Sequence, residues 1–96
     1  MATTFLDKVK QRLRITHNKL DDDLSAEISA ARDELQRIGV DAAMAASEDD
    51  PLITEAVKTY VQYKNAPDPK EADNLWASWI TQADGIRKAR TYRRSD

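Results

Sequence analysis

The chain has 96 residues, no cysteine and a single histidine, and 33% of its residues are charged. Folding at this length removes only ~60–65% of the unfolded chain's surface from water, so we expect one small domain that gains stability when it oligomerises. The lack of cysteine excludes a disulfide scaffold, a thiol nucleophile and a zinc ribbon, and the lone His17 excludes a histidine-rich metal site.

The charges are divided unevenly along the chain. Residues 1–86 carry 10 Lys and Arg against 16 Asp and Glu, a net charge of −6, whereas residues 87–96 carry five basic residues against Asp96, a net charge of +4. This asymmetry indicates that the C-terminal end meets an acidic partner, either a protein surface or a nucleic acid. No uninterrupted apolar stretch approaches the ~20 residues that span a bilayer, so we expect a soluble, intracellular protein that does not bind membranes.

The first half of the chain predicts two helices. Thr4 and Asp7 have the spacing of a weak capping box at the start of a helix over residues 4–14. A second helix is expected over residues 21–38, where one apolar stripe steps by three and four residues through Leu24, Ile28, Ala31, Leu35 and Ile38. Gly39 follows this helix and suits a left-handed cap.

The second half of the chain predicts two further helices. Residues 40–50 form a connecting loop with room for one helical turn. The pair Asp50-Pro51 is a strong helix start, so a third helix is expected over residues 51–64. The two prolines of the segment 65–69 end it, and a fourth helix is expected over about residues 70–90.

These patterns predict an all-α fold, a small bundle of about four helices with a basic C-terminal tail. Residues 1–90 are assigned to a single helical domain and residues 91–96 to the tail. No segment alternates in the manner of a half-buried strand. The linkers 15–20 and 65–69 are short, which favours antiparallel neighbours in one bundle.

The polar residues do not form a recognisable catalytic or metal site. Asp21–Asp23 and Glu48–Asp50 are interpreted as solvated carboxylates at helix starts, because adjacent residues point in different directions and no calcium-loop spacing is present. His17 is interpreted as a loop histidine without a nucleophile beside it. The two glycines, Gly39 and Gly85, cannot form a phosphate-binding loop. We therefore expect no enzyme, no metal and no cofactor.

Aromatic residues gather in the last two helices. Trp76 and Trp79, together with Tyr60 and Tyr63, have helical spacing and are interpreted as core or interface anchors, with base stacking as a minor alternative. Either Trp76 or Trp79 is expected to be a subunit contact, while the other serves the core.

The basic C-terminal run is the candidate partner-binding surface. Tyr92 lies within it and is interpreted as belonging to a tail too polar to pack internally. The residues expected to bind an anionic partner surface are Arg87, Lys88, Arg90, Tyr92, Arg93 and Arg94. A disordered tail without a partner is the competing interpretation. Truncation after Ala89 is expected to abolish docking and to leave the helical content largely intact.

The order of several segments resembles a known family. The segments are Leu13-Arg-Ile15, Asp21-Asp-Asp23, the helix from Leu24 to Ile38 with Ala30-Ala-Arg-Asp-Glu-Leu35, Gly39-Val40, Asp50-Pro-Leu-Ile53, Ala56-Val57 and Tyr60-Val61. Over about residues 5–64 they resemble the small head-tail connector proteins of tailed double-stranded-DNA bacteriophages, which are also called adaptor proteins and have been labelled DNA-packaging proteins.

The resemblance implies a structural virion protein without enzymatic activity. It implies assembly in the host cytoplasm into a homo-oligomeric ring, dodecameric in the virion, at the head-tail junction beneath the portal protein. The ring would extend the DNA channel and carry the stopper or tail-completion protein, and genomic DNA would pass through it without sequence-specific binding. In relatives the C-terminal segment reaches toward the portal, which makes residues 87–94 a candidate docking element.

The alternative is a small helical nucleic-acid-binding protein that uses the basic C-terminal tail as a phosphate-binding arm. Its second and third helices could form a helix-turn-helix. Against this alternative, about twelve residues separate those helices in place of a tight turn, and the body of the protein is net acidic. Binding whose affinity falls steeply with salt would favour it.

Overall fold

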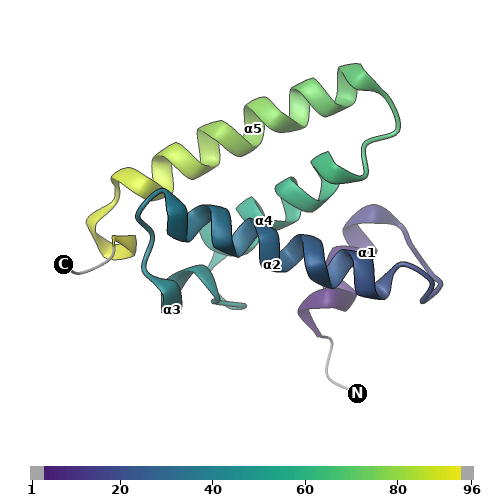
Figure 1. Cartoon of the computed structure of the whole chain (residues 1–96), viewed down its shortest axis with the longest axis horizontal. Helices are drawn as coiled ribbons and strands as arrows, with labels where there is room; N and C mark the ends of the chain where they lie inside the picture. The colour runs from purple at the N-terminus through teal and green to yellow at the C-terminus, as the bar shows by residue number, and fades with distance from the viewer. Residues whose placement is uncertain (1–3, 94–96) are drawn as a thin grey trace.

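The computed structural model describes residues 4–93, apart from the side chain of Arg90. Within this range the chain forms five α-helices and one turn of 3-10 helix, arranged as Figure 1 shows. The elements are α1 (Phe5–Leu13), α2 (Asp21–Arg37), α3 (Ala42–Ala45), α4 (Pro51–Lys64), α5 (Pro69–Lys88) and η1 (Arg90–Tyr92). The predicted all-α bundle is confirmed. Helix α3 is the one helical turn that was considered for the connecting segment 40–50.

Short-range capping explains where the helices begin. The Thr4 hydroxyl accepts a hydrogen bond from the Asp7 amide at 3.1 Å, and the Asp7 carboxylate accepts one from the Thr4 amide, so the predicted capping box is present. Asp50 caps α4 with Pro51 in its first turn. Asp68 caps α5 in the same way, and Pro69 therefore belongs to the first turn of α5, one residue earlier than predicted.

The end of α2 is a glycine-dependent turn. Gly39 has a φ of 108°, a left-handed conformation that costs a residue with a Cβ about 1 kcal/mol or more. The Val40 amide then donates to the Leu35 carbonyl at 3.0 Å, which closes the helix end. The turn directs the chain into α3, which is capped by Asp41.

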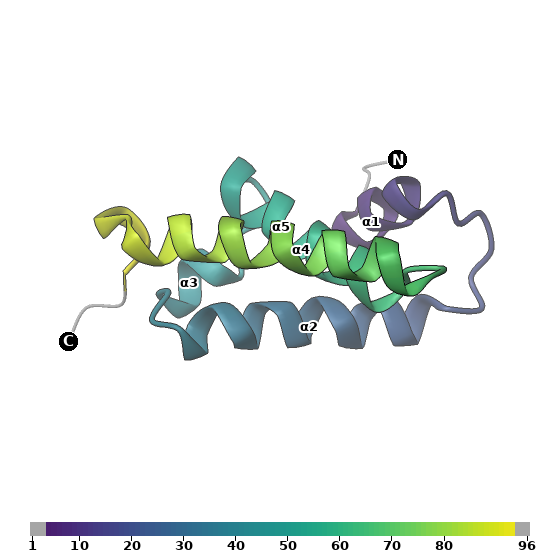
Figure 2. The ribbon, with the colours of Figure 1, turned by 90° about the horizontal axis from the view of Figure 1, so that it is seen from above.

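Helix α4 occupies the centre of the molecule and contacts α1, α2 and α5. Helix α5 runs back along α4 after the proline turn (Figure 1). In the view from above, α1 and α2 lie on either side of this pair (Figure 2), and they also contact each other directly. The molecule is a slab that measures 41 × 36 × 18 Å along its principal axes.

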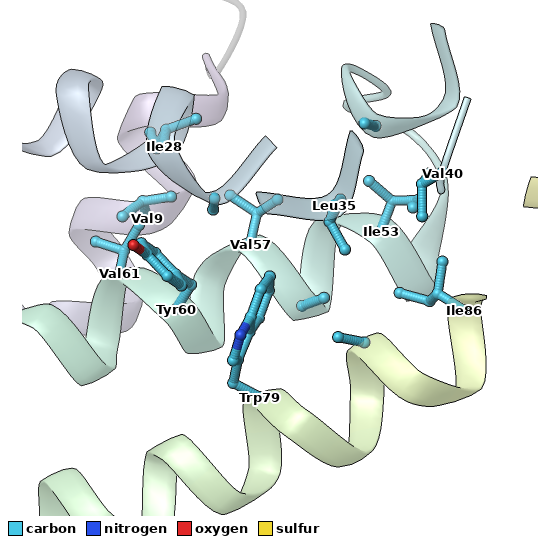
Figure 3. Packing of buried hydrophobic residues seen from close by; sticks show 14 of the residues in the cluster. Val9, Ile28, Leu35, Val40, Ile53, Val57, Tyr60, Val61, Trp79 and Ile86 are labelled. Atoms are coloured by element: carbon cyan, nitrogen blue, oxygen red, sulfur yellow. The ribbon is translucent and has the colours of Figure 1, made fainter. Parts of the chain in front are cut away.

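The core closes around α4 (Figure 3) and includes Leu24, Ile28, Ala31 and Leu35 of the predicted apolar stripe of α2. Its largest fully buried side chains are Leu24, Leu35, Ile53, Val9, Val40, Val57 and Val61. Trp79 of α5 packs edge-on against Tyr60 of α4, with 5.0 Å between the two ring centroids. Lys10 is buried beside this core, where its ammonium contacts Asp21 at 2.8 Å and Asn18 at 2.7 Å.

Candidate interaction surfaces

The C-terminal end of α5 carries a cluster of positive charge. Arg87 and Lys88 stand in the last turn of the helix and are both exposed. They flank Asp84, whose carboxylate lies 2.5 Å from the Arg87 guanidinium and 2.9 Å from the Lys88 ammonium. These hydrogen bonds, from Lys88 first and Arg87 second, lower the pKa of Asp84. One carboxylate cannot neutralise both cations, so this end of the helix stays positive.

Arg93 joins the same cluster from the 3-10 segment. Its Nε donates to the Arg87 carbonyl at 3.3 Å and its Nη2 to the Lys88 carbonyl at 3.5 Å. These are carbonyls that a helix leaves without partners at its C-terminus, where a cation is also favoured by the helix dipole. Arg87, Lys88 and Arg93 are called the basic cluster below. The Arg90 side chain and all of Arg94 lie outside the described residues.

Tyr92 contradicts the interpretation that it lies in a tail too polar to pack internally. The side chain is only 9% exposed, and its hydroxyl donates to the Asp50 carboxylate, 2.8 Å from Oδ2 and 3.0 Å from Oδ1. The Asp41 amide donates to the Tyr92 carbonyl at 2.8 Å, and Val40 forms a β-bridge with Arg93. The chain up to Arg93 thus packs on the start of α4, and Tyr92 is not available to a partner in this conformation.

The contact between Tyr92 and Asp50 is called the clasp below. Burial raises the pKa of the Asp50 carboxyl, but hydrogen bonds from Tyr92 and from the Ile53 and Leu52 amides together outweigh it, so the pKa is lowered. The same hydrogen bond raises the pKa of Tyr92, because ionised phenol would face the carboxylate. Asp50 therefore caps α4 and holds the C-terminal segment with one side chain.

The two tryptophans have different environments although they are three residues apart. Trp79 is 4% exposed and packs on Tyr60, so it is the core residue. Trp76 is 43% exposed, and its ring contacts that of Tyr63 at a centroid distance of 5.0 Å. Only Trp76 can be reached by a second molecule. A subunit contact through it stays a prediction.

Two further apolar side chains on the surface were not singled out from the sequence. Ile80 is 48% exposed and Leu52 is 56% exposed, and with Trp76 they are the large exposed hydrophobic residues of the described range. Leu52 lines a groove of about 290 Å³ together with residues of α5 that include Gly85 and Ile86. The spacing of Ile80 four residues after Trp76 was the available signal, because it places both on one side of α5.

The acidic runs serve helix ends and ion pairs. Asp21 forms an ion pair with Lys10, and Asp50 caps α4 and accepts the hydrogen bond of the clasp. His17 accepts a hydrogen bond from the Lys19 amide through Nδ1. Within residues 4–93 no three His, Cys, Asp or Glu side chains converge as metal ligands. No helix in the same range has the length and apolar character needed to cross a bilayer.

A small helical protein whose notable surface features are a basic cluster and exposed apolar side chains is typical of proteins that act by binding other macromolecules. The phage connector protein family matches this chain over residues 5–78, and the chain belongs to that family. No curated protein and no solved structure matches it. The match covers the segments of the predicted resemblance and extends it through Trp76 in α5.

Membership in this family establishes the general role. The protein is a bacteriophage virion component of the head-tail connector, from a structural family, and associates with other head or tail proteins. The match ends at residue 78, before the basic cluster. The assignment of Arg87, Lys88 and Arg93 to partner binding is therefore a prediction from charge and exposure alone.

Proposed function

We propose that the protein forms a homo-oligomeric ring, dodecameric in the virion, between the portal and the stopper or tail-completion protein. The family match over residues 5–78 carries this proposal. A 96-residue slab exposes a large surface for its volume, and ring assembly buries part of it. The ring would assemble in the host cytoplasm and would pass genomic DNA without sequence-specific binding.

The basic cluster is the proposed portal-docking element. Arg87, Lys88 and Arg93 are exposed, and the last turn of α5, which carries the first two, lies at one end of the molecule (Figure 1). The hydrogen bonds of Arg93 to α5 carbonyls hold it next to the other two cations, so the cluster is preorganised for an acidic surface. Arg90 and Arg94 add charge to the same end of the sequence.

Light scattering on the protein alone and mixed with the portal protein of the same genome tests the ring. We expect a stoichiometric complex whose mass is unchanged by nuclease. A portal that does not bind, combined with salt-sensitive retention of the protein on DNA, would instead favour the nucleic-acid-binding alternative.

Charge removal tests the docking element. Truncation after Ala89 would also remove the clasp, so substitutions are cleaner. The double variant Arg87→Gln, Lys88→Gln should weaken portal binding at least about tenfold. The matched control is Lys8→Gln, Lys70→Gln, which removes the same charge from two exposed lysines outside the basic cluster. Equal portal affinity of the two double variants would remove the docking role from the basic cluster.

A further inference from the structure

Two apolar surface features lie on opposite sides of α5. Trp76 and Ile80 are called the ridge, and the groove is lined by Leu52, Glu55, Thr81, Gln82, Gly85 and Ile86. Each residue of an α-helix is turned by ~100° from the previous one. Measured around the axis of α5 from the buried Trp79, Trp76 therefore lies about 60° and Ile80 about 100° to one side. Gln82 lies about 60° and Gly85 about 120° to the other side.

The two sides correspond to the two broad faces of the slab. The groove is on the face of α1, because its Glu55 accepts a hydrogen bond from Arg12 of α1 at 2.8 Å. Helix α2 lies on the other side of the α4–α5 pair, as Figure 2 shows, so the ridge faces the side of α2. The slab is only 18 Å thick, which lets one copy present the ridge on one face and the groove on the other.

We infer that the groove of one subunit receives the ridge of a second copy of this chain, in a contact between unlike surfaces. This inference rests on the proposed ring and names the surfaces that build it. A contact between two different patches of the same chain repeats from copy to copy and closes into a ring when the rotation is suitable. A contact of the ridge with itself would stop at a dimer.

The area available suits this partner. A broad face of about 41 × 36 Å exceeds the ~800 Å² that each partner contributes to a stable interface. The groove holds about 290 Å³, many times the ~30 Å³ of one water molecule, so large side chains can enter it. Ridge and groove contain the three large exposed hydrophobic residues of the described range, which are typical anchors at the centre of an interface.

The charges of the two features do not oppose burial. The ridge residues are uncharged, and Glu55 is the single ionisable residue of the groove lining. Its hydrogen bond with Arg12 lowers its pKa and compensates its charge within the subunit. Closing the groove with an apolar side chain therefore leaves no unpaired charge in the contact.

Two substitutions disable one feature each without touching the core. Ile80→Glu places a carboxylate on the ridge at a half-exposed position. Gly85→Glu extends a side chain into the groove, where a Cβ meets no atom within 4 Å, and replaces a glycine inside a helix. Ala77→Glu is the matched control, because it adds the same charge at an exposed position of α5, about 160° around the helix from the buried Trp79. Circular dichroism verifies that all three variants fold.

The test measures assembly by light scattering, at concentrations at which the parent chain associates and again with the portal added. We expect Ile80→Glu and Gly85→Glu each to weaken the subunit contact about 100-fold or more, and Ala77→Glu to assemble as the parent does. An equimolar mixture of Ile80→Glu and Gly85→Glu should form a 1:1 heterodimer, because one intact groove meets one intact ridge.

The outcomes separate this inference from the proposed ring. If the parent assembles on the portal and either Ile80→Glu or Gly85→Glu assembles equally well, the ridge-to-groove contact is wrong and the ring stands. A mixture that stays monomeric while both variants fail alone also overturns the contact between unlike surfaces. A parent chain that neither self-associates nor binds the portal overturns both proposals.

Discussion

Helix α5 is attached to the rest of the protein in two chemically different places. In its middle, Trp79 packs edge-on against the ring of Tyr60, with 5.0 Å between the two centroids. Beyond its end, Tyr92 returns to the body through a hydrogen bond to the Asp50 carboxylate. The first attachment depends on buried area and the second on protonation state. The bundle and the position of its basic cluster are therefore stabilised by separate interactions.

The largest expected effect is the loss of the apolar attachment. Trp79→Ala should reduce the free energy of unfolding by about 3–5 kcal/mol, because it leaves a cavity between α5 and α4. Domains of this kind have only about 5–15 kcal/mol in total, so urea denaturation should show a strongly lowered midpoint. A loss below about 1 kcal/mol would mean that Trp79 is not a core residue.

The clasp should contribute less than the apolar attachment. Tyr92→Phe keeps the ring and removes the hydrogen bond to a charged acceptor, which is worth about 1.5–3 kcal/mol. Asp50→Asn is the control, since asparagine can still cap α4. In the Asp50→Asn background, Tyr92→Phe should cost less than it does in the parent. Equal losses in both backgrounds, again by urea denaturation, would contradict a specific coupling between the two side chains.

The stabilisation by the clasp should depend on pH at both ends. Because the pKa of Asp50 is lowered, its contribution is present above the ordinary carboxyl pKa of about 4 and is lost as the pH falls through the lower value of the folded state. Because the pKa of Tyr92 is raised, its contribution is present below about pH 10 and is lost as the pH rises through the higher value of the folded state.

This pH dependence can be measured as the difference in Tm between the parent and Tyr92→Phe. The difference should be constant between about pH 5 and pH 9 and should shrink on both sides of that range. Side chains outside the clasp are the same in both proteins, so their contributions cancel in the difference. A difference that does not vary with pH would indicate that the clasp is not formed in solution.

The smallest expected effect concerns the exposed tryptophan. Trp76→Ala should cost about 0.5–1 kcal/mol, because the side chain is 43% exposed and loses mainly its contact with Tyr63. The same urea series that includes Trp79→Ala measures it. A cost as large as that of Trp79→Ala would place both tryptophans in the core and would leave the ridge without its main anchor.

The fold was largely predictable because its signals are local. The bounds of α4 agree with the prediction at both ends, since the Asp50 cap and Pro51 lie beside each other in the sequence. The left-handed turn at Gly39 and the capping box of Thr4 are likewise set by neighbours within a few residues. The start of α5 differed by one residue because Pro69, expected to end the previous segment, fits the first turn of the next helix.

The candidate site was predictable only in part. The basic residues could be identified from composition, and their role in docking stays a prediction. The interpretation of Tyr92 was wrong because its partner, Asp50, lies 42 residues earlier in the chain. The residues next to Tyr92 in the sequence are mostly cations, which indicate exposure. The carboxylate that accepts the hydrogen bond of its hydroxyl is not among these neighbours. The division of the chain into a helical domain over residues 1–90 and a tail over residues 91–96 stays a prediction.

By itself the sequence determined the all-α class, the positions of the main helices, the segregation of charge and the resemblance to connector proteins, because each depends on residue order and spacing. The tertiary structure alone decided that Trp79 is buried and Trp76 exposed, that Tyr92 binds Asp50, and that Leu52 and Gly85 border one groove. Helical spacing places a side chain on a face of its helix, but burial depends on which other helix covers that face. Such a contact between two helices joins residues that lie far apart in the chain, so local spacing does not determine it.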